Sequence, residues 1–334
     1  MSNQPIKHST SPRKRVIAWV IGFMAVLIGA GLLPPSSHGD ETNTGLASPL
    51  PLLVRARRGD TPASIAQRYL DDASKGWMIV EYNGIETLSG GEAILIPMAP
   101  FRPGGLTPGG YQIVPVLAYA DIGDASAFNH QMRGLKTAGF TAITPAQLID
   151  FMEFSSQLPL RSVLITFDTV SQPLYDIAIP ILNEYGFTAT VFVATDHIGG
   201  KGAMTWDQIK QLNEDGFTIA CRGRNGRSLT RRTKGQAFET YFKSVESELH
   251  LARKAIETHL DAPCLFLAYP HGSTNRLVSA MAAKLGFSAA FVLGPGENPF
   301  FADRFGIHRT VVDSHINPER FGNILTTLIT ADLN

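Results

Sequence analysis

Hydrophobic residues in the second two thirds of the chain fall into short runs separated by amphipathic stretches. Short apolar runs are typical of buried strands, and apolar residues at three-to-four spacing are typical of helices. Strands are predicted over residues 113–119, 163–167, 190–193, 217–221, 265–269, 289–293 and 307–312. Helices are predicted over residues 127–138, 145–152, 174–185, 206–214, 238–260 and 277–285. This alternation favours parallel strands covered by helices, as an open sheet or a closed barrel.

The longest predicted helix, over residues 238–260, carries one apolar stripe. Its hydrophobic side chains recur every three or four positions, which predicts a face packed on a core. They are Phe238, Phe242, Val245, Leu249, Ala252, Ile256 and Leu260.

Residues 16–33 are uncharged and mostly apolar, and a basic segment, residues 1–15, precedes them. As a helix this run rises about 27 Å, close to the ~30 Å of a hydrocarbon core. Because basic flanks stay in the cytoplasm, we expect a single-pass anchor in the bacterial inner membrane. The later domains would then lie in the periplasm or elsewhere outside the cytoplasm. A cleaved secretory peptide is the alternative, and it also exports the rest of the chain.

Two stretches rich in Pro, Gly, Ser and Thr, residues 34–50 and 99–111, are predicted linkers. They delimit a small unit, residues 51–98, and a large unit, residues 112–330. Lys plus Arg and Asp plus Glu each total 29, which excludes a polycation that binds nucleic acid by charge alone. The two cysteines exclude a disulfide-dense scaffold and a four-thiolate zinc site.

The small unit has the predicted order strand, helix, helix, strand, and it resembles a LysM module. The residues that carry the resemblance are Gly59, Asp60, Thr61, Ile65, Ala66, Asn83, Ile94, Ile96 and Pro97. The resemblance implies a βααβ fold that binds peptidoglycan or another N-acetylhexosamine polysaccharide. The implied sugar-contacting residues are Gly59, Asp60, Thr61, Tyr82 and Asn83. The alternative is that Gly59 and Asp60 only form a turn and a helix cap.

In the large unit, polar residues follow several predicted strands at the end where barrel enzymes place their chemistry. Asp168 ends one strand, Arg222 follows another, His271 follows a third, and Arg309 lies within the last. These strand ends resemble the polysaccharide deacetylases of carbohydrate esterase family 4, the NodB-homology domain. Further matching segments are residues 128–140, 185–192, 205–208 and 298–301. The resemblance runs from about residue 114 to about residue 321 and implies a distorted (β/α) barrel of about seven strands.

The resemblance also implies metal-dependent removal of N-acetyl groups, usually with zinc. The family pattern has one Asp as base, a second Asp as metal ligand, and two His four residues apart. A bound metal lowers the pKa of its water, and three protein ligands plus water form the open catalytic site.

Only the base position is retained, as Asp168. The ligand positions hold Thr169, Arg222 and Gly226, and a guanidinium does not deprotonate to bind a cation. We therefore predict no metal and no other cofactor. A rebuilt site is not favoured, because the remaining candidates stand one per segment: Cys221, His197, His271, His308 and His315. Cys221 and Cys264 fall at opposite ends of neighbouring predicted strands, so we expect free thiols.

Arg222 occupies a cation-ligand position, so we hypothesise that its guanidinium faces Asp168 and replaces the charge of the metal. A basic run begins there and continues through Arg224, Arg227, Arg231, Arg232 and Lys234. It fits either a solvated loop or a site for an anionic polymer. The resemblance places Trp206, Tyr269, His271 and Arg309 near the cleft, beside Arg222, as substrate-binding candidates. The alternative for Trp206 is that it only begins a helix capped by Thr205.

These observations favour a membrane-anchored, exported glycan-binding protein whose deacetylase-like barrel has lost its metal. One alternative is an active, zinc-dependent polysaccharide N-deacetylase with unconventional ligands. Another is a scaffold within an envelope protein complex. No nucleic-acid partner is expected.

Overall fold

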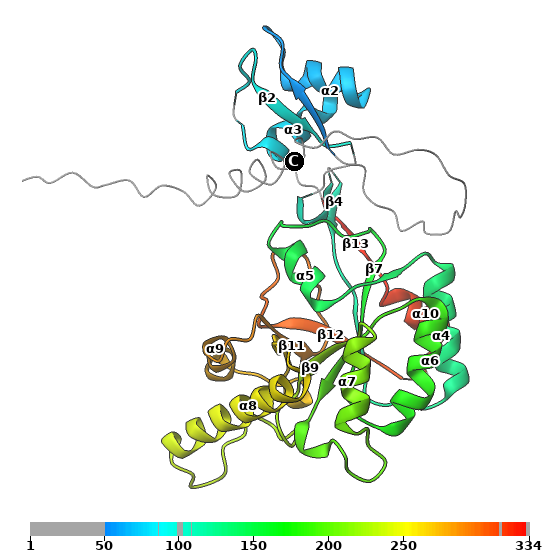
Figure 1. Ribbon diagram of the computed structural model, residues 1–334, viewed down its shortest axis with the longest axis vertical. Helices are drawn as coiled ribbons and strands as arrows, with labels where there is room; N and C mark the ends of the chain where they lie inside the picture. The colour runs from blue at the N-terminus through cyan, green and yellow to red at the C-terminus, as the bar shows by residue number, and fades with distance from the viewer. Residues whose placement is uncertain (1–50, 86, 99–102, 108, 314–315, 332–334) are drawn as a thin grey trace, which may run out of the picture. The chain divides into compact units, whose positions relative to one another are not determined.

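The computed structural model describes residues 51–85, 87–98, 103–107, 109–313 and 316–331 (Figure 1). The chain divides into two compact units, Met1–Phe101 and Arg102–Asn334. This division falls inside the predicted linker at 99–111. The predicted anchor at residues 16–33 lies outside the described residues. Among those described, no helix has the length and apolar character that crossing a membrane requires.

The small unit has the order strand, helix, helix, strand. Its elements are β1 (Leu52–Arg55), α2 (Pro62–Leu70), a 3-10 turn (Ala73–Lys75), α3 (Gly76–Asn83) and β2 (Ala93–Ile96). β1 and β2 pair antiparallel. Thr61 caps α2 by accepting a hydrogen bond from the backbone N–H of Ser64, whose hydroxyl in turn accepts from the N–H of Thr61. The core between the helices and the strands consists of Ala56, Ile65, Ala66, Ile79, Ile94 and Ile96.

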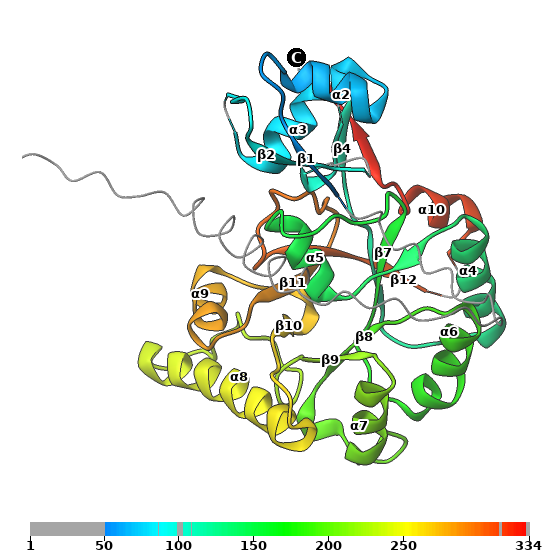
Figure 2. The same ribbon diagram turned by 45° about the horizontal axis from the view of Figure 1, so that its top comes forward.

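The large unit is a closed barrel of seven parallel strands (Figures 1 and 2). The order around the barrel is β5-β12-β11-β10-β9-β8-β7, and β7 pairs back with β5. All seven strands were predicted from the apolar runs, which left open whether the sheet closes. They are β5 (Val116–Tyr119), β7 (Ser162–Phe167), β8 (Thr190–Val193), β9 (Thr218–Cys221), β10 (Phe266–Ala268), β11 (Ala289–Leu293) and β12 (Ile307–Val312).

Helices cover the outside of the barrel (Figure 2). They are α4 (Ala125–Thr137), α5 (Pro145–Met152), α6 (Ile179–Tyr185), α7 (Trp206–Glu214), α8 (Phe238–Leu260), α9 (Arg276–Lys284) and α10 (Pro318–Asn323). The helix predicted over 174–185 begins instead as a π-helical turn, Leu174–Ala178, followed by α6. Pro180 explains the change, because its ring nitrogen cannot donate the helical hydrogen bond at that point.

Several short elements are not apparent from the hydrophobic pattern. β6 (Thr141–Ala142) pairs with β7, and a three-stranded sheet forms from β3 (Leu106–Thr107), β4 (Gly110–Gln112) and β13 (Leu328–Thr330). Short 3-10 turns occur at Pro103–Gly105, Thr195–His197 and Pro270–Gly272. These elements span two or three residues, too few to show a period.

The apolar stripe of α8 is confirmed except at its first residue. Val245, Leu249 and Ile256 are buried, whereas the Phe238 side chain is 58% exposed. Phe238 stands at the very start of α8, whose N-cap residue Ala237 makes no side-chain capping bond. The stripe also contains a buried acid, Glu248, which helps to organise the functional site.

Candidate functional site

The carboxyl ends of β7, β8 and β9 surround a cavity of about 460 Å³. The residue after β7 is Asp168, and the residue after β9 is Arg222. We call this space the mouth cavity. Its lining is Asp168, Thr169, Val170, Ser171, Phe192, Ala194, Asp196, His197, Gly200, Lys201, Gly202, Ala203 and Arg222.

Asp168 is held by two arginines. Arg309 Nη1 lies 2.6 Å from Asp168 Oδ1, and Arg309 Nη2 lies 3.1 Å from Oδ2. The Arg309 side chain is fully buried, and that of Asp168 is only 6% exposed. Arg309 Nη1 also donates to Thr166 Oγ1, and its guanidinium lies over the Phe192 ring. Because two parallel bonds fix a carboxylate in position and in plane, Arg309 is a positioning residue for Asp168.

Arg222 faces Asp168, as the sequence suggested. Its Nε lies 3.6 Å from Asp168 Oδ2. Its backbone N–H donates to Val193 O, which continues the pairing of β9 with β8. At 20% exposure, the Arg222 side chain is the more accessible of the two arginines. The carboxylate therefore meets one buried guanidinium and one that borders the cavity.

Backbone pairing between loops forms the walls of the mouth cavity. Ser171 forms an isolated antiparallel β-bridge with Ala203, and the Gln172 N–H donates to Gly202 O at 2.8 Å. On the other side, Asp196 N–H donates to Arg224 O at 2.8 Å. The loops after β7, β8 and β9 thus support one another through main-chain bonds.

The donors at the cavity do not fit a divalent metal. The Thr169 hydroxyl accepts the N–H of Ser171, and Gly226 has no side chain. A Cβ added at Gly226 would lie 3.8 Å from Arg222 Nη1, so the Arg222 side chain extends toward position 226. Within the described ranges, no three His, Cys, Asp or Glu side chains are placed to hold a metal. Two guanidiniums at the carboxylate also repel a cation.

Comparison with known proteins agrees with this architecture. The model of the polysaccharide deacetylase family matches residues 155–290. YxkH of Bacillus subtilis, named as a polysaccharide deacetylase, is 24% identical over 222 residues, or 64% of this chain and 77% of the relative. The solved structure of the Streptococcus pyogenes deacetylase PplD superposes with a TM-score of 0.58 at 19% identity, covering 64% of this chain and 98% of that one. The large unit carries a polysaccharide deacetylase-like domain.

The name of a second relative includes its polysaccharide substrate. The poly-beta-1,6-N-acetyl-D-glucosamine N-deacetylase of Staphylococcus aureus (strain MRSA252) is 24% identical over 190 residues, or 54% of this chain. The chain spans 65% of the length of that relative.

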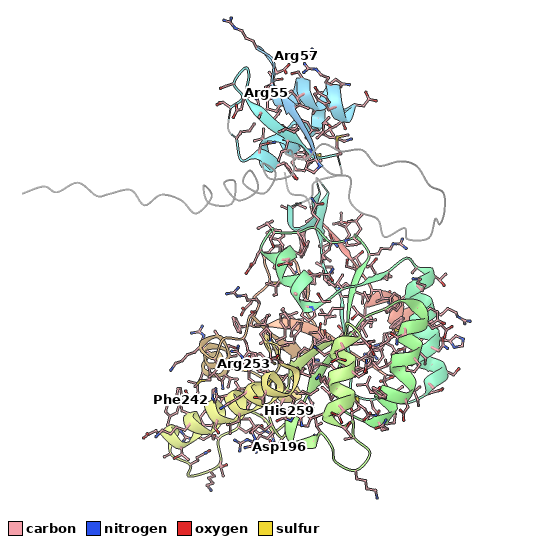
Figure 3. All side chains as sticks on the ribbon, in the orientation of Figure 1. Arg55, Arg57, Asp196, Phe242, Arg253 and His259 are labelled. Atoms are coloured by element: carbon pink, nitrogen blue, oxygen red, sulfur yellow. The ribbon has the colours of Figure 1, made fainter. Side chains whose placement is uncertain are left out.

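In the deacetylase-like domain, the basic run is largely neutralised near the barrel. Arg224 pairs with Asp196 at 3.2 Å, and Arg227 pairs with Glu248 at 3.6 Å. Glu248 also accepts the backbone N–H groups of Arg224 and Asn225. Sequence reasoning missed Glu248, although an acid between Val245 and Leu249 on an apolar stripe is a detectable signal. Figure 3 labels Asp196 in this region.

The end of the basic run differs from its beginning. Arg231, Arg232 and Lys234 are exposed, and none forms an ion pair within the part of the chain that the structure describes. The first half of the run is therefore a structural element, and the second half is a solvated cationic surface.

Two predicted substrate-binding residues are corrected. Tyr269 is fully buried, and its hydroxyl donates to Phe305 O at 3.1 Å, so it cannot stack on a sugar. Burial raises the pKa of Tyr269. Arg309 is also fully buried and engaged with Asp168. Neither side chain reaches solvent.

Trp206 and His271 do not line the mouth cavity. The Trp206 ring stacks on His259 of α8, with centroids 3.9 Å apart and an interplanar angle of 7°, and Figure 3 labels His259 on α8. Thr205 caps α7, as in the alternative interpretation of Trp206. His271 is exposed in the turn after β10, with a φ of 60°.

The residues considered for a rebuilt metal site are dispersed. Cys221 and Cys264 are buried free thiols, as expected. Cys221 pairs with Leu267 of β10, and Cys264 precedes Leu267 by three residues, so the two cysteines are not opposite each other. His197 lines the mouth cavity, and His308 packs beneath Gly296. His315 lies outside the described residues.

In the small unit, three predicted sugar-contacting side chains have structural roles. Asp60 forms a two-point ion pair with Arg68, with a shortest distance of 2.6 Å. Thr61 caps α2. Asn83 bonds to Ile79 O and to both backbone groups of Leu95, which ties α3 to β2. Gly59 supplies a turn with a φ of 88°. Tyr82 is half-buried.

Proposed function

We propose that this protein binds an envelope polysaccharide through a deacetylase-like barrel that no longer carries out metal-dependent hydrolysis. The observation that carries the proposal is the double pairing of Asp168 with Arg309 and Arg222. A general base must be free to take a proton from water. Here the carboxylate accepts hydrogen bonds from one guanidinium and faces a second.

The chemistry of amide hydrolysis supports this proposal. Hydrolysis needs an activated water and a polarised carbonyl, and a bound metal supplies both in enzymes of this kind. The positions that the family uses for ligands hold Thr169, Arg222 and Gly226. Without these ligands the barrel retains a cavity and loses the means to activate water.

The glycan class follows from the relatives and from the shape of the site. One relative is named for poly-beta-1,6-N-acetyl-D-glucosamine, so a polysaccharide containing N-acetylhexosamine is the proposed partner. The mouth cavity of about 460 Å³ falls within the roughly 300–1,000 Å³ of small-molecule sites. It therefore accommodates part of a sugar chain.

The small unit fits a second glycan-binding module of the LysM type. Its support is the βααβ order with antiparallel β1 and β2 and the motif residues described above. We propose that it holds peptidoglycan while the barrel engages its own glycan. Residues 16–33 would anchor the protein in the inner membrane and hold both modules outside the cytoplasm. There, the alternative function is that of a scaffold within an envelope protein complex.

The decisive experiment uses the full chain, loaded with zinc and then dialysed. We expect mass spectrometry to find no stoichiometric zinc and expect no release of acetate from poly-β-1,6-N-acetylglucosamine. In a separate binding assay, the same protein should still bind an envelope glycan. Stoichiometric zinc with acetate release would instead establish an active deacetylase. Absence of binding to every envelope glycan tested would favour the scaffold alternative.

The role of the small unit is tested by sedimentation with peptidoglycan. Tyr82→Ala is expected to reduce co-sedimentation. Phe301→Ala removes an aromatic side chain in the large unit that is 62% exposed and serves as the matched control. Equal retention of both variants and the native chain would remove Tyr82 from the glycan-binding surface.

A further inference from the structure

The mouth cavity has an excess of positive charge. Its two carboxylates, Asp168 and Asp196, are both paired with arginines. Lys201 lines the same cavity and forms no ion pair within the described residues. A partly enclosed cavity with surplus positive charge attracts anions more strongly than an open surface does.

Arg222 has unused donors at this cavity. Its Nε faces Asp168 at 3.6 Å, which is an ion-pair distance but not a hydrogen bond. Neither Nη atom donates a hydrogen bond within the part of the chain that is described. A guanidinium offers donors in a planar fork that matches a carboxylate at two points. The free side of Arg222 therefore suits an oxyanion.

A hydroxyl provides independent support. Ser171 Oγ is a buried atom with no hydrogen-bond partner among the described residues, and Ser171 and Arg222 both line the mouth cavity. A buried polar atom left without a partner is unfavourable by about 1–3 kcal/mol. A ligand oxygen in the cavity would satisfy it.

We propose that the mouth cavity binds an acidic sugar residue through its carboxylate. This inference rests on the proposed glycan-binding function and names the chemical class of the glycan. The carboxylate occupies the region that the family resemblance assigns to a metal, and Arg222 is the residue that distinguishes acidic from neutral sugars. A neutral acetamido group makes no use of the surplus charge, whereas a uronic acid neutralises it.

The test compares matched oligosaccharides by calorimetry with the full chain. The probes are an oligomer alternating N-acetylglucosamine and glucuronic acid, the same oligomer with its carboxyl groups reduced to alcohols, and a neutral oligomer of N-acetylglucosamine. We expect the acidic oligomer to bind at least about 10-fold more tightly than the reduced one. Arg222→Gln should weaken the acidic oligomer about 10- to 100-fold, the range for a charged hydrogen bond.

Two variants complete the design. Arg231→Gln is the matched control, because Arg231 is exposed and does not line the cavity; its binding should equal that of the native chain. Arg309 still holds Asp168 at two points in Arg222→Gln, so the fold should persist. If it does not, Lys201→Gln changes an exposed lysine of the same cavity and should weaken acidic binding several-fold.

The outcomes separate the two proposals. Equal affinity for the acidic and the reduced oligomers would overturn the acidic-sugar inference and leave glycan binding intact. Equal losses in Arg222→Gln and Arg231→Gln would indicate a diffuse charge effect and would also overturn it. Failure to bind all three oligomers would overturn the proposed function of the barrel itself.

Discussion

Arg309 and Asp168 form a two-point ion pair inside the barrel, with distances of 2.6 and 3.1 Å. The two residues come from β12 and from the end of β7, the strands that flank β5 on either side. The first strand, β5, therefore lies between the last strand, β12, and the next barrel strand, β7. The ion pair joins the two neighbours of β5 and adds to the backbone pairing that closes the barrel.

Removing Arg309 should destabilise the large unit strongly. Arg309→Met leaves the carboxylate of Asp168 buried with Arg222 as its remaining partner, and breaking a buried pair typically lowers the unfolding free energy by about 3–5 kcal/mol. Urea denaturation of the full chain, followed by circular dichroism, measures the change.

The double variant Asp168→Asn/Arg309→Met should recover part of this loss, because no buried carboxylate is then left without Arg309, and the charge that remains, on Arg222, is 20% exposed and borders the cavity. Arg304→Ala removes an exposed pair with Glu153, in which both side chains are more than half exposed, and should change stability by less than ~1 kcal/mol. A loss for Arg309→Met no larger than this control would show that the buried pair is not structural.

The role of Arg309 illustrates the limit of sequence reasoning at this site. The family resemblance placed Arg309 near the cleft, but it could not show how deeply the side chain is buried. The structure shows this depth: Ile307 and Arg309 lie on one face of β12 and are both fully buried, whereas His308 between them is not. The two-residue period of a strand thus places an arginine among inward-facing residues. A buried arginine requires a buried acid as its partner, and Asp168 is that acid.

The fold was more predictable than the side-chain contacts. The seven barrel strands followed from their apolar runs, and α7 and α8 have the predicted bounds. Stacking of Trp206 on His259 depends on how two helices cross, which one sequence does not determine. The same holds for Asn83, which joins α3 to β2 across twelve positions.

The ion pair between Asp60 and Arg68 should make the small unit sensitive to acid. The hydrogen bond from Arg68, together with the backbone N–H of Arg57, lowers the pKa of Asp60 from 3.8 to about 2. Because the folded pKa is depressed, the stabilisation is present above the unfolded pKa and is lost as the pH falls from about 4 to about 2.

Hydrogen exchange of the α2 amides at several pH values measures this dependence. Asp60→Asn should abolish the part of this pH dependence that comes from Asp60. It should also lower the stability of the small unit at neutral pH. A native chain whose α2 protection stays constant between these pH values would contradict the assignment.

The two thiols should be unreactive in the folded protein. Cys221 and Cys264 are no more than 1% exposed, and burial raises the pKa of Cys221 to about 12. Burial also raises the pKa of Cys264 well above its ordinary value. Since the thiolate is the reactive form, both the low accessibility and the raised pKa slow the reaction.

Titration with a chromogenic disulfide at neutral pH measures the reactive thiols. We expect none in the native chain and both in denaturant, since the sequence contains two cysteines. Rapid reaction of one thiol without denaturant would indicate that β9 or β10 opens locally.

Restoring the three ligand positions should restore metal binding. In Thr169→Asp/Arg222→His/Gly226→His, one carboxylate and two imidazoles replace groups that do not bind zinc, and three such ligands suffice for an open site. The Arg222 side chain already extends toward position 226, because a Cβ at Gly226 would lie 3.8 Å from Arg222 Nη1. The φ of 70° at Gly226 adds strain of roughly 1–3 kcal/mol for any side chain there, which zinc binding must exceed.

Metal analysis after zinc loading and gel filtration provides the measurement. The triple variant is expected to retain close to one zinc per chain, and the native chain none. A control with alanine at position 226, Thr169→Asp/Arg222→His/Gly226→Ala, carries similar backbone strain with one ligand fewer and should bind zinc more weakly. Equal zinc in the triple variant and in this control would mean that position 226 does not reach the metal. Zinc retained by the native chain would overturn the loss of the metal site on which the proposed function rests.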